Sequence, residues 1–154
     1  MKNYLEDIAF HKDKIYTAHI DPEDYDFHVH SGYQLTYIIG GTTYLIIDGF
    51  SYLIPTRHFV WIPPNVKHKF SHGLRKALSV YNIYAPIIDH NNNAFFDRIG
   101  IYPAPNVLIE ILKTTTNKII NKHDEEFKFL NSVFKLLPNL IDHSFEMSLP
   151  IAET

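Results

Sequence analysis

Residues 14–102 are divided into short runs of β-branched and aromatic residues, separated by glycine, proline and aspartate. Runs of this length and spacing predict many short strands in a sandwich or small barrel, rather than alternating βαβ units. The dipeptide Asp48-Gly49 best fits a two-residue hairpin turn, in which both residues need a positive φ. The expected strands cover residues 14–20, 33–39, 42–47, 50–54, 58–62, 66–70, 75–84 and 95–102.

After Pro105 the apolar residues recur at intervals of three and four, which predicts amphipathic helices. The first helical pattern covers residues 108–119. The second begins at Asp124, a favourable N-cap residue, and runs to Pro138, which should end or kink the helix. Because this second pattern is apolar over much of its circumference, the helix would either only cover the barrel or also contact a second subunit.

Composition excludes several classes of protein. The chain has no cysteine, so it has no disulfide, no thiolate nucleophile and no cysteine-ligated zinc. Its apolar runs are too short to span a membrane, and the first residues do not resemble a secretory signal. The net charge is −3 and the 14 Lys and Arg residues are scattered. We therefore expect a cytoplasmic protein with no membrane partner and no DNA-binding face of its own.

The most informative segment contains two of the ten histidines. His28, His30 and Gln34 have the same parity, so in an extended chain their side chains point to one side. His68 lies on a later predicted strand and can meet them if the sheet closes into a barrel. Three imidazoles and one side-chain carbonyl are a sufficient ligand set for a divalent transition metal. The same side chains could instead hydrogen-bond a small organic ligand, or one another.

The spacing of these residues resembles the two motifs of the cupin family. The matching residues are His28, His30, Gln34 and Gly41 for the first motif, and Pro63, Asn65 and His68 for the second. The departures are Gln34 for the usual glutamate, Asn65 for glycine, Arg57-His58 for a common Gly-Asp pair, and His72 for a common asparagine. A neutral amide is a poorer metal ligand than a carboxylate and a poor general base, so Gln34 weakens an enzymatic interpretation.

A narrower resemblance is to the sensor domains of AraC-type transcription regulators. The similar strings are HVHSGYQLTY at residues 28–37, VWIPP at 60–64 and YNIYAP at 81–86. The resemblance implies a mainly β fold: a cupin-type β-barrel (double-stranded β-helix or jelly roll) with a C-terminal helical hairpin, α+β overall. In that family the hairpin forms a homodimer, and a linker then leads to two helix-turn-helix units that bind DNA.

The resemblance also implies a regulatory function and no enzymatic activity. Residues 1–104 would form the barrel with its N-terminal arm, 105–147 the dimerising hairpin, and 148–154 the start of a linker to a DNA-binding domain. A small-molecule effector would contact His28, His30, Gln34 and His68, directly or through a divalent transition metal. Its binding would bias the N-terminal arm or the angle of the hairpin and so reposition the attached domain.

Two other classes of function stay open at the level of sequence. A stand-alone metal-dependent cupin enzyme, such as a dioxygenase or isomerase, would hold its metal tightly and lose turnover when His28 or His68 is replaced by alanine. A plain dimerisation module with a vestigial pocket would tolerate replacement of all four pocket residues. The sequence does not identify the effector.

Overall fold

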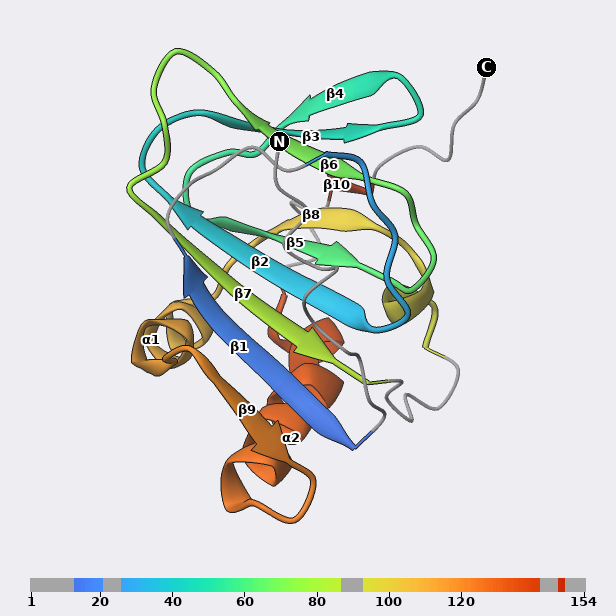
Figure 1. Cartoon of the computed structure of the whole chain (residues 1–154), viewed down its shortest axis with the longest axis vertical. Helices are drawn as coiled ribbons and strands as arrows, with labels where there is room; N and C mark the ends of the chain where they lie inside the picture. The colour runs from blue at the N-terminus through green and yellow to red at the C-terminus, as the bar shows by residue number, and fades with distance from the viewer. Residues whose placement is uncertain (1–12, 21–25, 87–92, 142–146, 149–154) are drawn as a thin grey trace.

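The chain folds into two antiparallel sheets (Figure 1). The computed structural model describes residues 13–20, 26–86, 93–141 and 147–148. The larger sheet has the order β10-β8-β5-β2-β7-β1-β9, and the smaller sheet has the order β4-β3-β6. The strands are β1 (Lys14–Ile20), β2 (Tyr33–Ile39), β3 (Thr43–Ile47), β4 (Phe50–Leu53), β5 (His58–Ile62), β6 (Lys69–His72), β7 (Ser79–Ala85), β8 (Gly100–Pro103), β9 (Lys118–Asn121) and β10 (Met147–Ser148). This arrangement confirms the prediction of a mainly β, cupin-like barrel.

Alternate residues of the larger sheet face two different apolar cores. On β5, Trp61 lies in the core shared with the helices, whereas Val60 lies with Leu45 in the core between the two sheets. On β2, Leu35 belongs to the helix-side core, so the neighbouring Gln34 faces the space between the sheets. The period of two therefore separates the packing face of the sheet from the face that can bind a ligand.

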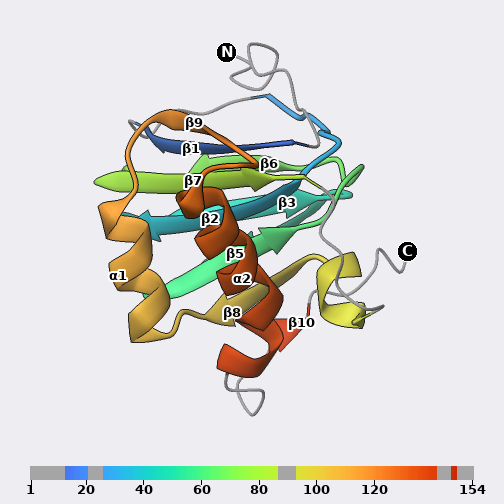
Figure 2. The same cartoon turned by 90° about the horizontal axis from the view of Figure 1, so that it is seen from below.

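Two helices cover the outer face of the larger sheet (Figure 2): α1 (Asn106–Thr114) and α2 (Glu125–Leu140). As predicted, Asp124 is the N-cap of α2. The ring of Phe134 packs 5.7 Å from the ring of Trp61, which anchors α2 on the sheet. Pro138 lies in the last turn, so α2 continues past it by only two residues. Neither described helix is long and apolar enough to cross a membrane.

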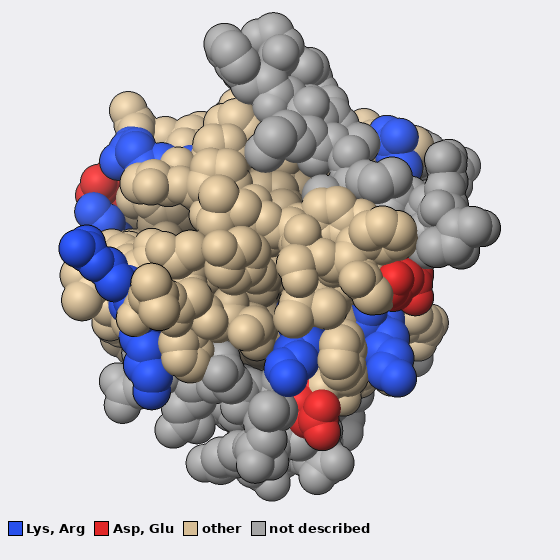
Figure 3. Space-filling view, turned by 90° about the horizontal axis from the view of Figure 1, so that it is seen from above, with Lys and Arg blue, Asp and Glu red and all other residues tan. Residues whose placement is uncertain are grey.

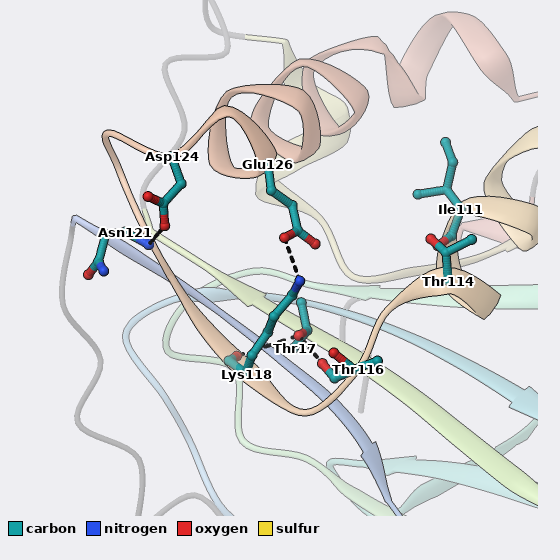
Figure 4. A network of polar contacts seen from close by, with 8 residues as sticks. All are labelled: Thr17, Ile111, Thr114, Thr116, Lys118, Asn121, Asp124 and Glu126. Carbon is teal, nitrogen blue, oxygen red and sulfur yellow. Dashed lines mark hydrogen bonds and ion pairs between the residues drawn. The ribbon is translucent and has the colours of Figure 1, made fainter.

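A strand stands between the two helices, where the sequence predicted continuous helix to residue 119. Residues Lys118–Asn121 form β9 and pair with β1, which would otherwise be an open sheet edge. Figure 4 shows how this strand is held: Thr17 of β1 donates to the Thr116 carbonyl, and Lys118 forms an ion pair with Glu126 of α2 at 2.6 Å. The β-branched threonines before β9 disfavour helix and allow this change of structure.

Two other predicted strands begin later than expected, at Lys69 in β6 and Ser79 in β7. The predicted strand over residues 95–102 is wrong in its first half, which is a 3-10 helix, η2 (Ala94–Asp97). Phe95 and Phe96 are both buried in the helix-side core. In a strand these neighbours would point to opposite faces, whereas a helical turn lets both enter one core.

Three residues other than glycine have a positive φ, among those described, and each lies in a turn. Asp48 (49°) and Gly49 (81°) confirm the predicted hairpin turn. Asn65 (66°) stands at the cupin glycine position, and asparagine tolerates this left-handed backbone better than most residues. Arg57 (61°) is the third. The expected N-terminal arm and residues 149–154 of the expected linker lie outside the described residues.

Candidate ligand-binding site

The four residues singled out in the sequence meet at one end of the space between the sheets. The ring of His68 lies 4.4 Å from that of His28 and 5.1 Å from that of His30, measured between centroids. Nε2 of His30 lies 2.7 Å from Oε1 of Gln34. His30, Gln34 and His68 are buried, and His28 is half-buried. The structure therefore brings together residues that are up to 40 positions apart in the chain.

Backbone hydrogen bonds outside the main sheets place these histidines. The amides of His28 and His68 each donate to the carbonyl of the other at 3.1 Å, forming an isolated bridge. The amide of Asn65, in its tight turn, donates to the His30 carbonyl at 2.9 Å. The segment before β2 and the segment before β6 are thus joined, and His68 lies one residue before its strand rather than within it.

A backbone carbonyl lies beside Nδ1 of each of the three rings. Nδ1 lies 2.7 Å from a carbonyl oxygen in every case; the oxygens belong to Asp26 for His28, Gly32 for His30 and Val66 for His68. A carbonyl oxygen only accepts, so in neutral His28 and His68 Nδ1 carries the proton and Nε2 keeps a lone pair. His30 has an oxygen beside both ring nitrogens, Gly32 O at Nδ1 and Gln34 Oε1 at Nε2, so its neutral ring donates to only one of them. Nε2 of His68 is buried with no hydrogen-bond partner. A buried nitrogen of this kind can accept a donor from a ligand.

A chain of polar side chains continues from His30 along the inner face of the larger sheet. The Gln34 amide nitrogen donates to Thr36 Oγ1 at 2.7 Å and lies 3.3 Å from Asn82 Oδ1. The Thr36 hydroxyl donates to the same Asn82 oxygen at 2.5 Å. Sequence reasoning missed Asn82, although an amide at an inward position of a strand otherwise rich in apolar residues was the available signal.

Burial keeps the site uncharged. It lowers the pKa of His68 from 6.5 to about 3, and the charge of His28 acts in the same direction. Burial also lowers the pKa of His30 and of His28. At neutral pH the site therefore presents three neutral imidazoles. The Gln34 amide has two roles here, because its oxygen lies beside Nε2 of His30 and its nitrogen donates to Thr36, whereas a carboxylate could only accept.

The fit of a metal ion to these residues is incomplete. Nδ1–H groups bonded to backbone carbonyls, with Nε2 left unprotonated, are the usual support of metal-binding histidines. However, no group of three or more His, Cys, Asp or Glu side chains in the described part of the chain is arranged to hold a metal ion. The donor atoms suit a divalent transition metal, but the rings would have to move to coordinate one.

Residues 15–88 match the family described as the AraC-like ligand binding domain. This segment contains β1 except for Lys14, the strands β2 to β7 and all four residues of the site. This part of the chain is similar to AraC-like ligand-binding domains. The resemblance found in the sequence is thereby confirmed. No curated protein sequence matches the chain.

The chain also resembles solved structures in fold. Unsaturated fatty acid bound wild-type ToxT from Vibrio cholerae strain SCE256 superposes with a TM-score of 0.54 at 13% identity, over 88% of this chain and 56% of that chain. A second structure of ToxT from Vibrio cholerae, in the P21 form, has a TM-score of 0.48 at 14% identity, over 92% of this chain and 61% of that chain. The first comparison establishes a common fold, and the match spans little more than half of the ToxT chain.

Proposed function

We propose that this AraC-like domain senses a small-molecule effector between its two sheets and controls a DNA-binding domain of the same regulator. The observation that carries the proposal is the buried Nε2 of His68, which has no hydrogen-bond partner and shares its space with His28 and His30. A buried polar atom without a partner costs about 1–3 kcal/mol. A ligand that supplies the missing donor would recover that free energy.

The protonation state of the site indicates the chemistry of its effector. His28 and His68, neutral and protonated at Nδ1, present their Nε2 atoms as acceptors to the ligand space, whereas Nε2 of His30 faces Gln34 Oε1. A fitting effector would therefore donate through hydroxyl or N–H groups. The fatty acid in the ToxT structure is a ligand of that protein; here it supports only the general statement that this fold accommodates a small organic molecule.

The experiment is a thermal-stability screen with sugars, polyols, phenols and other hydroxyl-bearing compounds. An effector present at 100 times its Kd would raise the free energy of unfolding by about 2.7 kcal/mol. The same compound should have little effect on the His68→Leu variant. His58→Gln is the matched control, because His58 is a half-buried histidine whose Nδ1 also lies near a backbone carbonyl oxygen, that of Thr56, but outside the site.

A ligand that stabilises wild type and His68→Leu equally would refute the site assignment. The regulatory step needs a protein that carries its DNA-binding domain. There, the effector should change DNA affinity, and an unchanged affinity at saturating effector would refute the proposed control while leaving the binding site intact.

Metal binding is the second use of the same site. A divalent transition metal, if bound, would be held by His28, His30 and His68, with the Gln34 carbonyl as a further donor. The metal would supply a positive centre that attracts an effector oxygen. The backbone carbonyls beside each Nδ1 would orient the three rings. An enzymatic role has less support, because none of His28, His30, Gln34 and His68 is a carboxylate that could act as a general base.

Homodimerisation through α2 is also part of the proposal. Val133 is buried, but Phe129 and Leu136 are 53% and 49% exposed on α2, and Leu140 at its end is partly exposed. These residues belong to the additional apolar side of the second helix, for which the sequence allowed two roles: covering the barrel or contacting a second subunit. One face of α2 covers the larger sheet, and the exposed row on its other side would contact a second copy of the domain.

DNA binding would come from outside the described part of the chain. Figure 3 views the molecule from the side of the smaller sheet, where Lys and Arg lie in separate groups near the margins with uncharged surface between them. A DNA-binding face usually has its basic residues clustered. We therefore propose that a separate domain binds DNA, and that the regulator acts in the cytoplasm.

A further inference from the structure

A second pocket lies at the opposite end of β2 from the histidines. It has a volume of about 290 Å³ and lies between the end of β2, the β4–β5 loop and the last turn of α1. Figure 2 shows α1 beside the end of β2 and the start of β5. Ile39 and Ile54 are among its apolar lining residues, and Arg57 and Lys113, both exposed, are its basic ones. No acidic residue is among the described residues that line it.

Arg57 occupies an unfavourable backbone conformation in this pocket. Its φ of 61° is left-handed, which costs a residue with a Cβ atom roughly 1–2 kcal/mol. Glycine would avoid that cost, and glycine is common at this position in the related cupin motif. Strained residues of this kind are concentrated at binding and active sites. The strained backbone of Arg57 is therefore consistent with a binding role for its side chain.

The guanidinium of Arg57 is fixed beside the start of α1. It donates to the side-chain oxygen of Asn106, the first residue of α1, and the Arg57 carbonyl accepts from the Ala104 amide at 2.8 Å. A guanidinium has five N–H donors, so one bond to Asn106 leaves others for a ligand. Its charge also acts on the buried phenol of Tyr37 in the pocket wall, where it opposes the rise in pKa caused by burial.

We propose that this pocket binds a small organic carboxylate, with its charge between Arg57 and Lys113 and its apolar body against Ile39 and Ile54. Guanidinium and ammonium groups form charge-assisted hydrogen bonds with carboxylates, which are about twice as strong as neutral ones. The volume is at the lower end of the range for small-molecule sites. The site is separate from the histidines and does not depend on their proposed function.

A ligand here would contact both the barrel and the helices. Arg57 belongs to the loop that leads into β5 of the barrel, and Lys113 belongs to α1. A carboxylate held by both would stabilise the position of α1 against the barrel. The pocket can therefore transmit ligand binding from the barrel to the helices.

The test uses octanoate as the probe and octanol as its uncharged counterpart, titrated into the whole chain by isothermal calorimetry and by NMR. Octanoate should bind at least ten-fold more tightly than octanol. Its affinity should fall at least ten-fold in Arg57→Gly and in Lys113→Gln. Arg57→Gly removes the charge and also the backbone strain, so this variant should unfold at the same temperature as wild type or higher.

Arg98→Gln is the matched control, because Arg98 is also an exposed arginine but lies before β8, away from the pocket. It should bind octanoate like wild type. Equal binding of octanol and octanoate, or unchanged octanoate affinity in folded Arg57→Gly and Lys113→Gln, would overturn the proposal. Loss of octanoate binding in His68→Leu but not in these two variants would overturn it as well, since the carboxylate would then occupy the histidine site.

Discussion

His28 and His68 form a reciprocal backbone pair, in which each amide donates to the other's carbonyl at 3.1 Å and the rings meet at 4.4 Å with planes 66° apart. Neither residue lies in one of the named strands. The pair joins the segment before β2 to the segment before β6 and so connects the larger sheet to the smaller one. The candidate ligand site therefore depends on the same contact that closes this end of the barrel.

Replacing His68 by leucine should change the free energy of unfolding by no more than about 1 kcal/mol. Leucine removes a buried nitrogen that has no partner, which offsets the lost bond to the Val66 carbonyl. Urea unfolding at pH 7.5 measures this change. Leu45→Ala, in the core between the sheets, is the comparison and should cost about 2–5 kcal/mol. A similar loss in both variants would show that His68 is required for folding rather than reserved for a ligand.

Stability should decrease on acidification below pH 6.5. Folded His68 stays neutral down to its pKa of about 3, whereas an unfolded histidine takes up a proton below about pH 6.5. Protonation therefore favours the unfolded chain between these values, and the contribution is about 1.4 kcal/mol per pH unit. The lowered pKa values of His28 and His30 act with the same sign.

Urea unfolding of the protein in EDTA, at pH 7.5, 6.5, 5.5 and 4.5, measures this dependence. The His68→Leu variant should lose stability less steeply than wild type over this range. If the two proteins show the same slope, His68 does not carry the pH dependence.

The Gln34→Glu variant should be less stable than wild type and should bind a divalent metal ion more tightly. A carboxylate cannot donate to Thr36 and would face the Asn82 oxygen, so the metal-free variant should lose about 1–3 kcal/mol at pH 7.5. A carboxylate is the stronger ligand, so Ni²⁺ should bind at least ten-fold more tightly in competition with a chelating dye. Gln34→Leu is the control and should bind Ni²⁺ no better than wild type. Equal affinities for wild type and Gln34→Glu would exclude position 34 from any metal site.

The exposed row of α2 should control association of the domain. Replacing Phe129 and Leu136 together by glutamine should weaken dimerisation at least ten-fold, while monomer stability stays within about 0.5 kcal/mol of wild type. Sedimentation equilibrium measures the association. Leu74→Gln is the control, since Leu74 is a fully exposed leucine in the loop between β6 and β7. A dimer with a Kd of about 100 μM would already be a weak one. A wild-type domain that stays monomeric at about that concentration would therefore contradict dimerisation through α2.

Gly41 and Gly49 should respond differently to alanine, although both have a positive φ, of 65° and 81°. A Cβ atom on Gly41 would lie 2.4 Å from the Lys76 carbonyl carbon and oxygen, whereas one on Gly49 would have nothing within 4 Å. Gly49→Ala should therefore cost about 1 kcal/mol from backbone strain alone, and Gly41→Ala about 3 kcal/mol or more. Thermal unfolding of the two variants makes the comparison. Equal costs would mean that the loop before β7 moves freely away from Gly41.

Local patterns explain what sequence reasoning predicted well. The alternation in β2 placed Gln34 on the inward face, and Asp48-Gly49 predicted its turn, because side-chain period and turn chemistry depend on adjacent residues. Asp124 likewise marked the start of α2. The shared parity of the two histidines and the glutamine predicted that they lie on one side, although bends at residues 31–32 interrupt the extended segment between them.

The sequence by itself determined the barrel class, the inward parity of His28, His30 and Gln34, and the start of the second helix. Only the tertiary structure decided that Asn82 joins Gln34, that residues Lys118–Asn121 leave the helix to pair with β1, and that Arg57 meets α1. These contacts join segments 48, 101 and 49 residues apart. Which segments pair depends on how the sheets close and on which sheet edges stay unpaired. The spacing of neighbouring residues does not predict either of these.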